Sequence, residues 1–269
     1  MNVTRSGYYI YIKKRWLQKN ERTDMQLITY VKELSQKSNY SYGSRRISKS
    51  LKAKGFEVGR YRARRLMLKA KVECKQRRIY KITTESNHNL PVAENKLNRK
   101  FQVNKPNEVW VTDITYLWTK EGWLYLAAVL DLFSRRVVGW SMSKHLRTEL
   151  IKDALNMAMK RRQPKTELMH HSDRGSQYAS TNYQNTLKKL GIKISMSRKG
   201  NCWDNAVMER FFGSLKSERT DFKKYENREQ AKADVIDYIE MFYNSERLHS
   251  TLDYMSPLQY EKKHSALFC

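Results

Sequence analysis

The stretch 108-EVWVTDITYLWTKEGWLYLAAVLDLFSRRVVGWSMS-143 contains three β-rich runs, 108–118, 123–133 and 135–143. β-Branched and aromatic residues are enriched in each run, and short turn-like segments separate one run from the next. Such runs are typical of strands, and the short separations predict that the three strands form a meander.

Helices and short strands alternate after this stretch. The periodicity of apolar residues predicts a helix, a strand, a second helix and a second strand, at 147–162, 167–173, 180–191 and 192–197. Two further helices follow, one within 199–218 and one over 228–246. A meander followed by this alternation predicts an α/β fold with a mixed five-stranded sheet covered by helices.

The chain is strongly basic, and the excess of positive charge lies mainly in its first third. There are 53 Lys and Arg against 27 Asp and Glu in 269 residues, a formal net charge of +26. Residues 1–100 hold 26 of the basic residues and 7 of the acidic ones. This asymmetry predicts a polyanionic partner, most simply nucleic acid. An anionic membrane surface is the rival interpretation, but it requires an amphipathic helix with a wholly apolar face, and the basic region shows no such pattern.

A pair of helices is predicted within the basic helical region, residues 1–81. A first helical period covers 26–38, and the pair lies within 43–72, with Ser44 as N-cap of its first helix and Gly55 at that helix's end. Fifteen Lys and Arg and only two Glu lie between residues 43 and 81. This charge density favours a DNA-binding helix-turn-helix over a helical hairpin with a solvated basic face. The candidate DNA contacts in it are Arg45, Arg46, Arg60, Arg62, Arg64 and Arg65.

Composition sets the remaining boundaries and exclusions. Residues 82–106 are polar, with Pro91 and Pro106 and little periodicity, which predicts a linker ahead of a core domain over 107–269. No run of eighteen apolar residues and no signal-peptide pattern occur, so a cytoplasmic protein without a membrane span is expected. The three cysteines, Cys74, Cys202 and Cys269, have no metal-ligand spacing.

Two aspartates lie in otherwise apolar β surroundings. Asp113 is inside the first predicted strand, in VTDIT, and Asp173 follows a later strand, in HHSDRGSQY. Neighbouring strands of one sheet can bring such groups within a few ångströms, where burying their charge is costly unless a positive ion compensates it. Because oxygen-rich carboxylate sites suit Mg²⁺ or Mn²⁺, this pair predicts a divalent metal site.

A third carboxylate is expected from the helix in 199-KGNCWDNAVMERFFGSLKSE-218. On a wheel of about 100° per residue, Glu209 lies at the edge of the apolar face and Lys216 is nearly in line with it. Glu218 falls on the opposite side, where we expect solvent. Asp204 precedes the apolar positions and suits an N-cap or first-turn acid. The geometry therefore selects Glu209 as the site residue.

The spacing of Asp113, Asp173 and Glu209, with 35 residues between the second and the third, resembles the Asp-Asp-Glu triad of the retroviral-integrase superfamily. With 130-LDLFSRRVVGW-140 and 243-YNSERLHSTLDYMSPLQYE-261, these motifs resemble the transposases of bacterial insertion sequences. The similarity is to the branch encoded by two overlapping frames, specifically its second-frame product, and covers about residues 40–262. In that branch the first-frame product usually precedes this region in a frameshift fusion.

The resemblance implies a ribonuclease H-like catalytic core in which the three acids hold two ions of Mg²⁺ or Mn²⁺. Such a site would hydrolyse a phosphodiester at the element's end and join the freed 3′-OH to another strand. It also implies DNA contact by Lys216 and, further round the helix, by Arg210. Because two double-stranded DNA ends must be held at once, a homodimer or larger assembly is expected at the bacterial nucleoid. The first-frame product is an expected fusion or partner.

Two other functions share parts of this pattern. A non-catalytic DNA-binding regulator or inhibitor of transposition would share the helix-turn-helix and the charge, but it has no need of three carboxylates at this spacing. A nuclease built on the same core would cut DNA without joining it.

Two further groups of residues receive structural interpretations. His170 and His171 suggest metal ligands, but adjacent strand residues point to opposite faces, so at least one is expected to be structural. The tryptophans of the strand region are expected to pack in the core and at its rim; they are Trp110, Trp118, Trp123 and Trp140.

Overall fold

The computed structural model describes residues 4–75, 90–165 and 167–265. The chain divides into two compact units, Met1–Gln76 and Arg77–Cys269. Within the described ranges, no helix is both long enough and apolar enough to cross a membrane.

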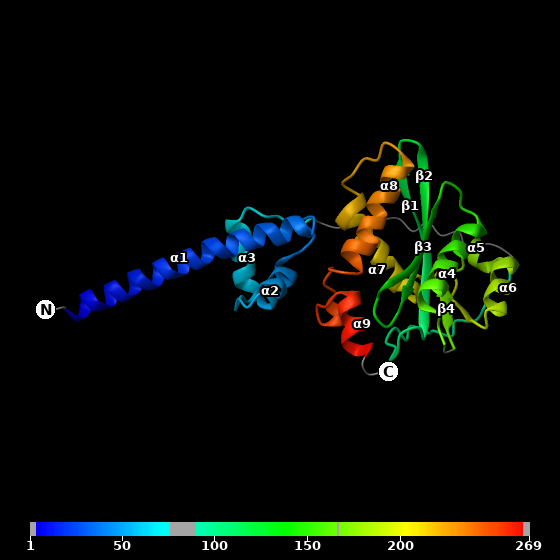
Figure 1. The fold of residues 1–269 in the computed structure, drawn as a ribbon, viewed down its shortest axis with the longest axis horizontal. Helices are drawn as coiled ribbons and strands as arrows, with labels where there is room; N and C mark the ends of the chain where they lie inside the picture. Colours follow the sequence, from blue (N-terminus) through cyan, green and yellow to red (C-terminus); the bar gives the residue numbers. More distant parts are fainter. Residues whose placement is uncertain (1–3, 76–89, 166, 266–269) are drawn as a thin grey trace. The chain divides into compact units, whose positions relative to one another are not determined.

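The first unit is helical, and its described helices are α1 (Arg5–Lys37), α2 (Ser44–Ala53) and α3 (Arg60–Lys69) (Figure 1). The pair α2 and α3 confirms the helix pair that the sequence predicts over 43–72. Gly43, rather than Ser44, is the N-cap of α2. Gly55 ends that helix with φ of +88°, a left-handed conformation that glycine adopts without strain.

The helix α1 is much longer than the predicted period over 26–38. Among the α1 residues whose burial is described, buried apolar positions begin at Leu27 and continue at Val31. They pack with Ile47 and Leu51 of α2 and Leu66 of α3 as the core of the unit. Among the α1 residues whose burial is described, apolar periodicity therefore marks those that are buried in the helical unit.

The second unit contains a five-stranded sheet in the order β3-β2-β1-β4-β5. The first three strands form an antiparallel meander, and β4 and β5 continue the sheet in parallel with β1. This arrangement confirms the predicted mixed sheet and the ribonuclease H-like class. The strands are β1 (Val109–Thr119), β2 (Gly122–Asp131), β3 (Val137–Ser143), β4 (Met169–Ser172) and β5 (Lys193–Met196).

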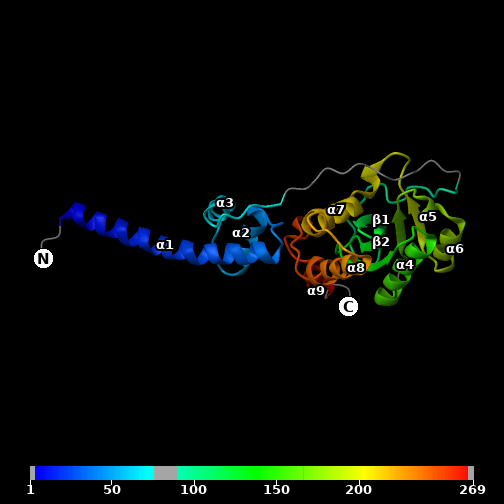
Figure 2. The same cartoon turned by 90° about the horizontal axis from the view of Figure 1, so that it is seen from above.

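Helices cover both faces of the sheet, as Figures 1 and 2 show. On one face, α4 (Thr148–Arg162), α5 (Ser176–Ala179) and α6 (Thr181–Lys189) pack against Trp110 and Val129. Gly139 of β3 permits close packing there, because a Cβ at this position would lie 2.7 Å from the Ala158 backbone nitrogen.

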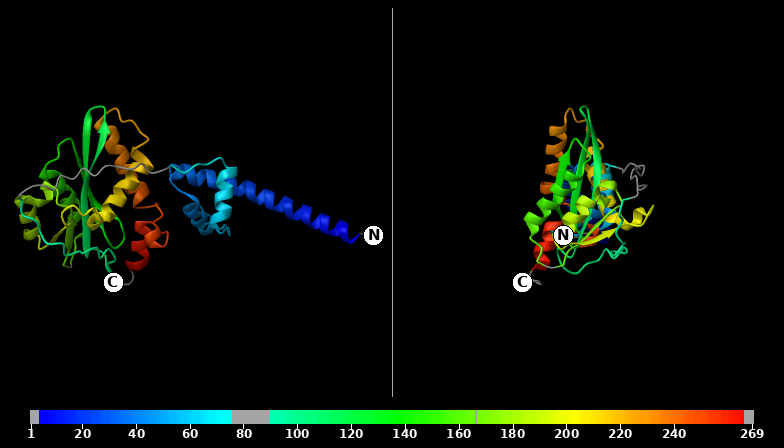
Figure 3. Two further views of the ribbon diagram at one scale, coloured as in Figure 1. Left: turned by 180° about the vertical axis from the view of Figure 1, so that it is seen from behind. Right: turned by 90° about the vertical axis from the view of Figure 1, so that its right-hand side faces the viewer.

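The opposite face carries α7 (Ala206–Leu215) and α8 (Arg228–Ile236), seen in yellow to orange from behind in Figure 3. Phe211 and Ile239 are buried there against Val111 and Leu130. Both predicted helices of this region are interrupted. The first comprises the 3-10 turn η1 (Cys202–Asn205), α7 and the π-helical η2 (Lys216–Thr220). The second comprises α8 and the π-helical η3 (Asp237–Tyr243). The short η4 (Ser250–Leu252) and α9 (Pro257–Ser265) complete the chain.

The predicted linker, 82–106, is packed over much of its described part. Its residues 82–89 lie outside the described ranges, but the backbone nitrogens of Lys96 and Leu97 donate to Ser195 Oγ of β5 at 3.0 and 3.1 Å. Leu97 is buried in the core of the second unit. The segment is held by isolated contacts, namely these backbone bonds, the burial of Leu97 and the side chains of Asn95 and Arg99. Such contacts follow no helix or strand period, which is why the sequence resembles a linker. The domain boundaries otherwise remain a prediction.

Candidate active site

The two predicted aspartates lie where β1 and β4 diverge. The parallel pairing of these strands ends with Val111 opposite His171. Continuing that register by two residues places Asp113 level with Asp173, on strands that would be roughly 5 Å apart. Both side chains are half-buried and line one cavity of about 250 Å³. The sheet topology therefore brings together two acids that lie far apart in the sequence.

Backbone amides orient both carboxylates. The Ile114 N–H donates to Asp113 Oδ1 at 2.8 Å, and the Gly175 N–H donates to Asp173 Oδ1 at 2.9 Å. Gly175 leaves little spare room, since a Cβ there would lie 3.1 Å from the same Asp173 oxygen. The turn after β4 thus holds its acid in one orientation toward the cavity.

Glu209 and Lys216 bring further charge to this place from α7 and η2. Glu209 is exposed in the first turn of α7, and Lys216 is half-buried at the start of η2. The pKa of Asp113 is raised well above its usual value, by burial first, then by the charge of Asp173 and more weakly by that of Glu209. The Ile114 N–H and the Lys216 ammonium act in the opposite direction. Two further carboxylates and one lysine therefore act on Asp113.

The donor set fits a hard divalent cation in its chemistry. Carboxylate oxygens suit Mg²⁺ and Mn²⁺, and a bound cation would oppose the burial and the neighbouring negative charge that raise the pKa of Asp113. In the described part of the chain, no three His, Cys, Asp or Glu side chains already form a metal-holding cluster. Glu209 acts on Asp113 through its charge but does not form such a set with the two aspartates.

The cavity has a wall of tyrosines that the sequence pattern did not indicate. Tyr116 and Tyr125, which are paired across β1 and β2, and Tyr178 of α5 line it beside the aspartates. Tyr116 could have been placed from the sequence, because side chains two apart on a strand share a face and Ile114 and Tyr116 are therefore neighbours on one face. The same alternation along β2 applies to Tyr125.

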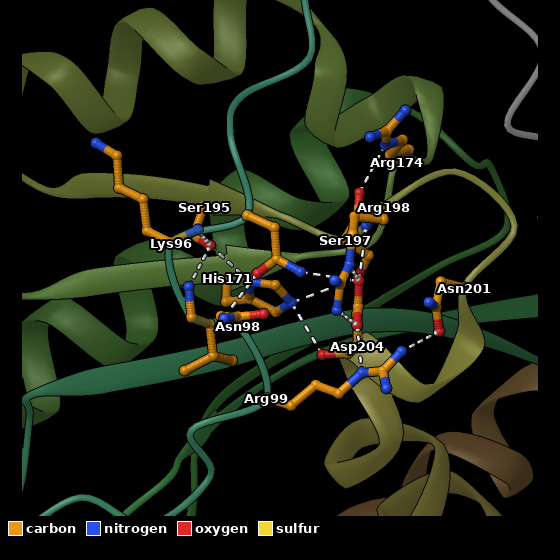
Figure 4. A network of polar contacts seen from close by, with 12 residues as sticks. Lys96, Asn98, Arg99, His171, Arg174, Ser195, Ser197, Arg198, Asn201 and Asp204 are labelled. Carbon is orange, nitrogen blue, oxygen red and sulfur yellow. Dashed lines mark hydrogen bonds and ion pairs between the residues drawn. The ribbon is translucent and has the colours of Figure 1, made fainter.

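Asp204 connects the entry of α7 to the segment before β1 (Figure 4). Its fully buried carboxylate accepts hydrogen bonds from Arg198 Nη2 at 2.8 Å, Arg99 Nε at 2.8 Å and Asn95 Nδ2 at 2.8 Å. Asp204 lies in the first turn of η1, as expected, but its partners are arginines and an asparagine rather than an N-cap hydrogen bond. These bonds hold the loop that positions Glu209.

Because Arg198 and the other donors hold the pKa of Asp204 well below its usual range, Asp204→Asn should destabilise the protein. We expect a loss of about 2–3 kcal/mol at pH 7, which becomes smaller as the pH falls below about 4, where the wild-type carboxylate starts to lose this advantage. Urea unfolding at pH 7 and pH 3 measures it. The exposed Asp153→Asn is the control, and a loss independent of pH would contradict this account.

Both histidines of β4 have structural roles, as expected for at least one of them. His170 Nε2 lies 3.0 Å from the Tyr183 hydroxyl, and His171 Nδ1 lies 2.8 Å from Ser195 Oγ. Burial lowers the pKa of His170 to about 3 and that of His171 to about 4, so both are neutral at pH 7. His171 Nε2 also lies 3.1 Å from the Asp204 carbonyl oxygen, which connects the strand of Asp173 to the helix of Glu209.

The prediction that Glu218 faces solvent is wrong. Its side chain is buried and accepts hydrogen bonds from Arg247 Nη2 at 2.6 Å, Arg247 Nε at 2.7 Å and the Tyr238 hydroxyl at 2.8 Å. On a wheel of about 100° per residue, Glu218 lies opposite Glu209 but at about the same angle as Val207 and Phe211, which belong to the apolar face. The position opposite Glu209 is therefore on the core side of the helix, and the acid is buried there.

The candidate DNA-binding residues lie mostly at the surface of their own unit. Arg45, Arg60, Arg64 and Arg65 are exposed on α2 and α3, and Arg210 is exposed on α7. Arg62 forms an ion pair with Asp24 at 3.0 Å, and the Arg46 guanidinium lies 5.2 Å from the Tyr42 ring centroid. DNA contact by any of these residues remains a prediction.

Comparison with known families identifies the chain. Two models described as integrase core domain match residues 103–202 and 209–264, and an HTH-like domain matches residues 21–80. The chain is 39% identical over 267 residues to the transposase InsF of insertion sequence IS3A from Escherichia coli (strain K12), covering 99% of this chain and 93% of that protein. The chain belongs to the insertion-sequence transposases with an integrase core.

Other relatives agree with this membership. The transposase is 43% identical over 262 residues to the IS600 uncharacterized 31 kDa protein of Shigella sonnei, covering 97% and 96% of the two chains. It is also 42% identical over 225 residues to the transposase of IS904 from Lactococcus lactis, covering 83% and 88%. Membership makes the transposase an enzyme of DNA transposition and integration, and it confirms the resemblance seen in the sequence.

Solved structures similar to the transposase include two from retroviruses. A chain of the simian T-cell lymphotropic virus intasome in complex with a PP2A regulatory subunit has a TM-score of 0.49 and 16% identity, over 81% of this chain and 70% of that one. The HTLV-2 integrase catalytic core domain in complex with magnesium has a TM-score of 0.44 and 19% identity, over 58% and 96%.

Proposed function

We propose that this transposase cleaves DNA at the ends of its insertion sequence and transfers the freed 3′-OH to another strand. Asp113, Asp173 and Glu209 are its catalytic carboxylates. The observation that carries this proposal is the meeting of the three negative charges at the fork between β1 and β4, where the charges of Asp173 and Glu209 raise the pKa of Asp113. A DNA-binding regulator without catalysis would gain nothing from this arrangement.

The same three acids would hold two ions of Mg²⁺ or Mn²⁺. When bound, the ions would supply Lewis-acid stabilisation of the attacking and leaving oxygens. The protein's part is orientation. The amides of Ile114 and Gly175 hold the two aspartates toward the cavity, and the Asp204 loop positions the helix of Glu209. Lys216 would contact a DNA phosphate beside the acids, since its ammonium already interacts with Asp113.

Binding of the element's end is assigned to the helical unit and its arginines, with Arg210 as a further phosphate contact on α7. A protein that joins two DNA ends must hold both, so the active form is a homodimer or a larger assembly on double-stranded DNA. The product of the first reading frame, fused or separate, is a candidate partner. The place of action is the bacterial cytoplasm, at the nucleoid.

Metal removal tests this function. Purified protein is incubated with labelled DNA from the inverted repeats beside its coding sequence, in Mg²⁺, in Mn²⁺ or in EDTA. We expect cleaved and joined strands only with a divalent cation, and their return when Mg²⁺ exceeds the chelator. DNA binding measured by gel shift should persist in EDTA, because the helical unit does not use the carboxylates. Cleavage that is insensitive to EDTA would overturn the proposal.

A further inference from the structure

Four aromatic side chains lie on one face of the β1–β2 hairpin, near its turn. Tyr116 is paired with Tyr125, and Trp118 is paired with Trp123. Because residues two apart on a strand point to the same side, the four form a continuous surface, here called the aromatic ladder. Trp118 is 60% exposed and Trp123 is 43% exposed. The expectation that both tryptophans pack in the core or at its rim therefore differs from what the structure shows.

The fold does not need these side chains for its core. On the other face of the same hairpin, Leu117 and Leu124 are buried, and Leu124 packs with Tyr225 and Ala231. That contact already covers one side of the sheet. Large aromatic groups left at a surface in this way are typical of a binding site.

The aromatic ladder is continuous with the carboxylate cavity. Tyr116 and Tyr125 line that cavity together with Asp113 and Asp173. The Trp123 ring centroid lies 5.1 Å from that of Tyr116 and 4.8 Å from that of Trp118. The rings therefore extend, without a break, from the two aspartates toward the end of the hairpin.

Cationic side chains lie beside the part of the ladder that is nearest the cavity. The Lys216 ammonium lies 5.3 Å from the Tyr116 ring centroid. Ser143, paired with Tyr125, is followed by the exposed Lys144 and Arg147. Aromatic faces interleaved with cationic groups suit single-stranded nucleic acid, whose bases stack on the rings while its phosphates meet the cations. This combination favours a DNA strand over an apolar protein surface as the occupant.

We propose that the aromatic ladder binds an unpaired base of the DNA strand that is cut at the carboxylates. Within a duplex both faces of a base are covered by its neighbours, so only an unstacked base can lie on Trp118 or Trp123. Such stacking would offset the cost of opening the DNA end. The inference rests on the proposed function and deepens it, since it assigns a locally opened DNA end as the substrate.

The geometry limits which base is bound. Trp118 is five residues from Asp113 along β1, which corresponds to about 17 Å. Bases in a duplex strand are about 3.4 Å apart, so the bound base lies within about five nucleotides of the cleaved bond, and nearer if the strand is extended.

The test is a double-mutant cycle between protein and DNA. Cleavage by Trp118→Leu and Trp123→Leu is compared with wild type on intact end DNA, and then on DNAs with one abasic residue at each of about five positions on either side of the cleaved bond. We expect each leucine variant to cleave intact DNA roughly tenfold more slowly. On the DNA that is abasic at the position of the bound base, the ratio of the wild-type cleavage rate to that of each leucine variant should fall to about one, because no base remains to stack. Trp118→Phe and Trp123→Phe retain a ring and should remain close to wild type.

A second measurement uses the wild-type protein alone. End DNA with 5-iodouracil at each of the same positions is irradiated in the complex, and the cross-linked peptide is identified by mass spectrometry. We expect cross-links to Trp118 or Trp123 from one or two adjacent positions. No cross-link to the ladder from any position would overturn the proposal.

The outcomes separate this inference from the function on which it rests. If wild type does not cleave end DNA, the proposed function fails. If wild type cleaves but the leucine variants are as fast, or their defect is the same on every abasic DNA, only the ladder proposal fails. A change in oligomeric state by sedimentation velocity, without any dependence on the base, would make the ladder a protein interface and would also overturn it.

Discussion

Asp113→Asn, Asp173→Asn and Glu209→Gln are each expected to lower DNA cleavage and strand transfer roughly 1,000-fold or more. Each change keeps the size of the side chain but removes the charge that would hold a divalent cation, and metal catalysis of this kind supplies several kcal/mol of transition-state stabilisation. Cleavage and joining should fall together, because one site performs both reactions. Product formation on labelled end DNA under single-turnover conditions measures the loss.

Two controls show that the loss is chemical rather than structural. Glu149→Gln changes an exposed acid in the first turn of α4, which matches Glu209 in α7, and it should leave the rate unchanged. Asp113→Asn should be at least as stable as wild type in a chelator, because the raised pKa of Asp113 means that its charge is disfavoured in the folded state. A Glu209→Gln or Glu209→Ala protein that still joined strands would contradict the assignment of Glu209.

Arg247→Met is expected to lower the free energy of unfolding by about 3–5 kcal/mol. Both Arg247 and its partner Glu218 are buried, and they share two short hydrogen bonds. Removing the guanidinium leaves a buried carboxylate that has lost the charge of Arg247, although the Tyr238 hydroxyl still donates to it. The loss should be large because an uncompensated buried charge costs much more than the pair itself contributes. Urea unfolding at pH 7, followed by circular dichroism, measures it.

The exposed ion pair between Lys120 and Glu226 is the matched control for this effect. Its atoms are 2.6 Å apart, as in the buried pair, but its side chains are 65% and 63% exposed. Glu226→Gln should therefore cost less than about 1 kcal/mol. The double change Glu218→Leu with Arg247→Met should recover part of the loss, since no buried charge remains. Equal losses for Arg247→Met and Glu226→Gln would show that burial does not decide the effect.

Most of the fold could be predicted because its signals are local. The runs at 108–118 and 123–133 became β1 and β2, since the β-branched and aromatic residues that favour strands are concentrated within them. The pair α2 and α3 was recognisable from a glycine turn between two apolar periods. What was missed lies where local periodicity is absent, as in the first turns of α1 and in the segment around Leu97.

The sequence pointed to the acids of the candidate site but not to the residues around them. Asp113 and Asp173 stood out because carboxylates are unusual in apolar strands, and Glu209 because of its place on a helix face. The tyrosine wall and the exposed Trp118 and Trp123 did not, since an aromatic residue in a strand is equally compatible with burial and exposure.

The sequence by itself determined the class of fold and most of its strands and helices, and it indicated three acids as the candidate site, because each depends on residue types and spacings read along the chain. Only the tertiary structure decided where the charges of other acids are compensated. Glu218 meets Arg247 from 29 residues away, and Asp204 meets Arg99 from 105 residues away. No local pattern encodes such a pair, because a carboxylate looks the same in sequence whether its partner is water or a buried arginine. Folding places the partner beside the carboxylate, and the burial of the pair then determines how much it contributes to the free energy of unfolding.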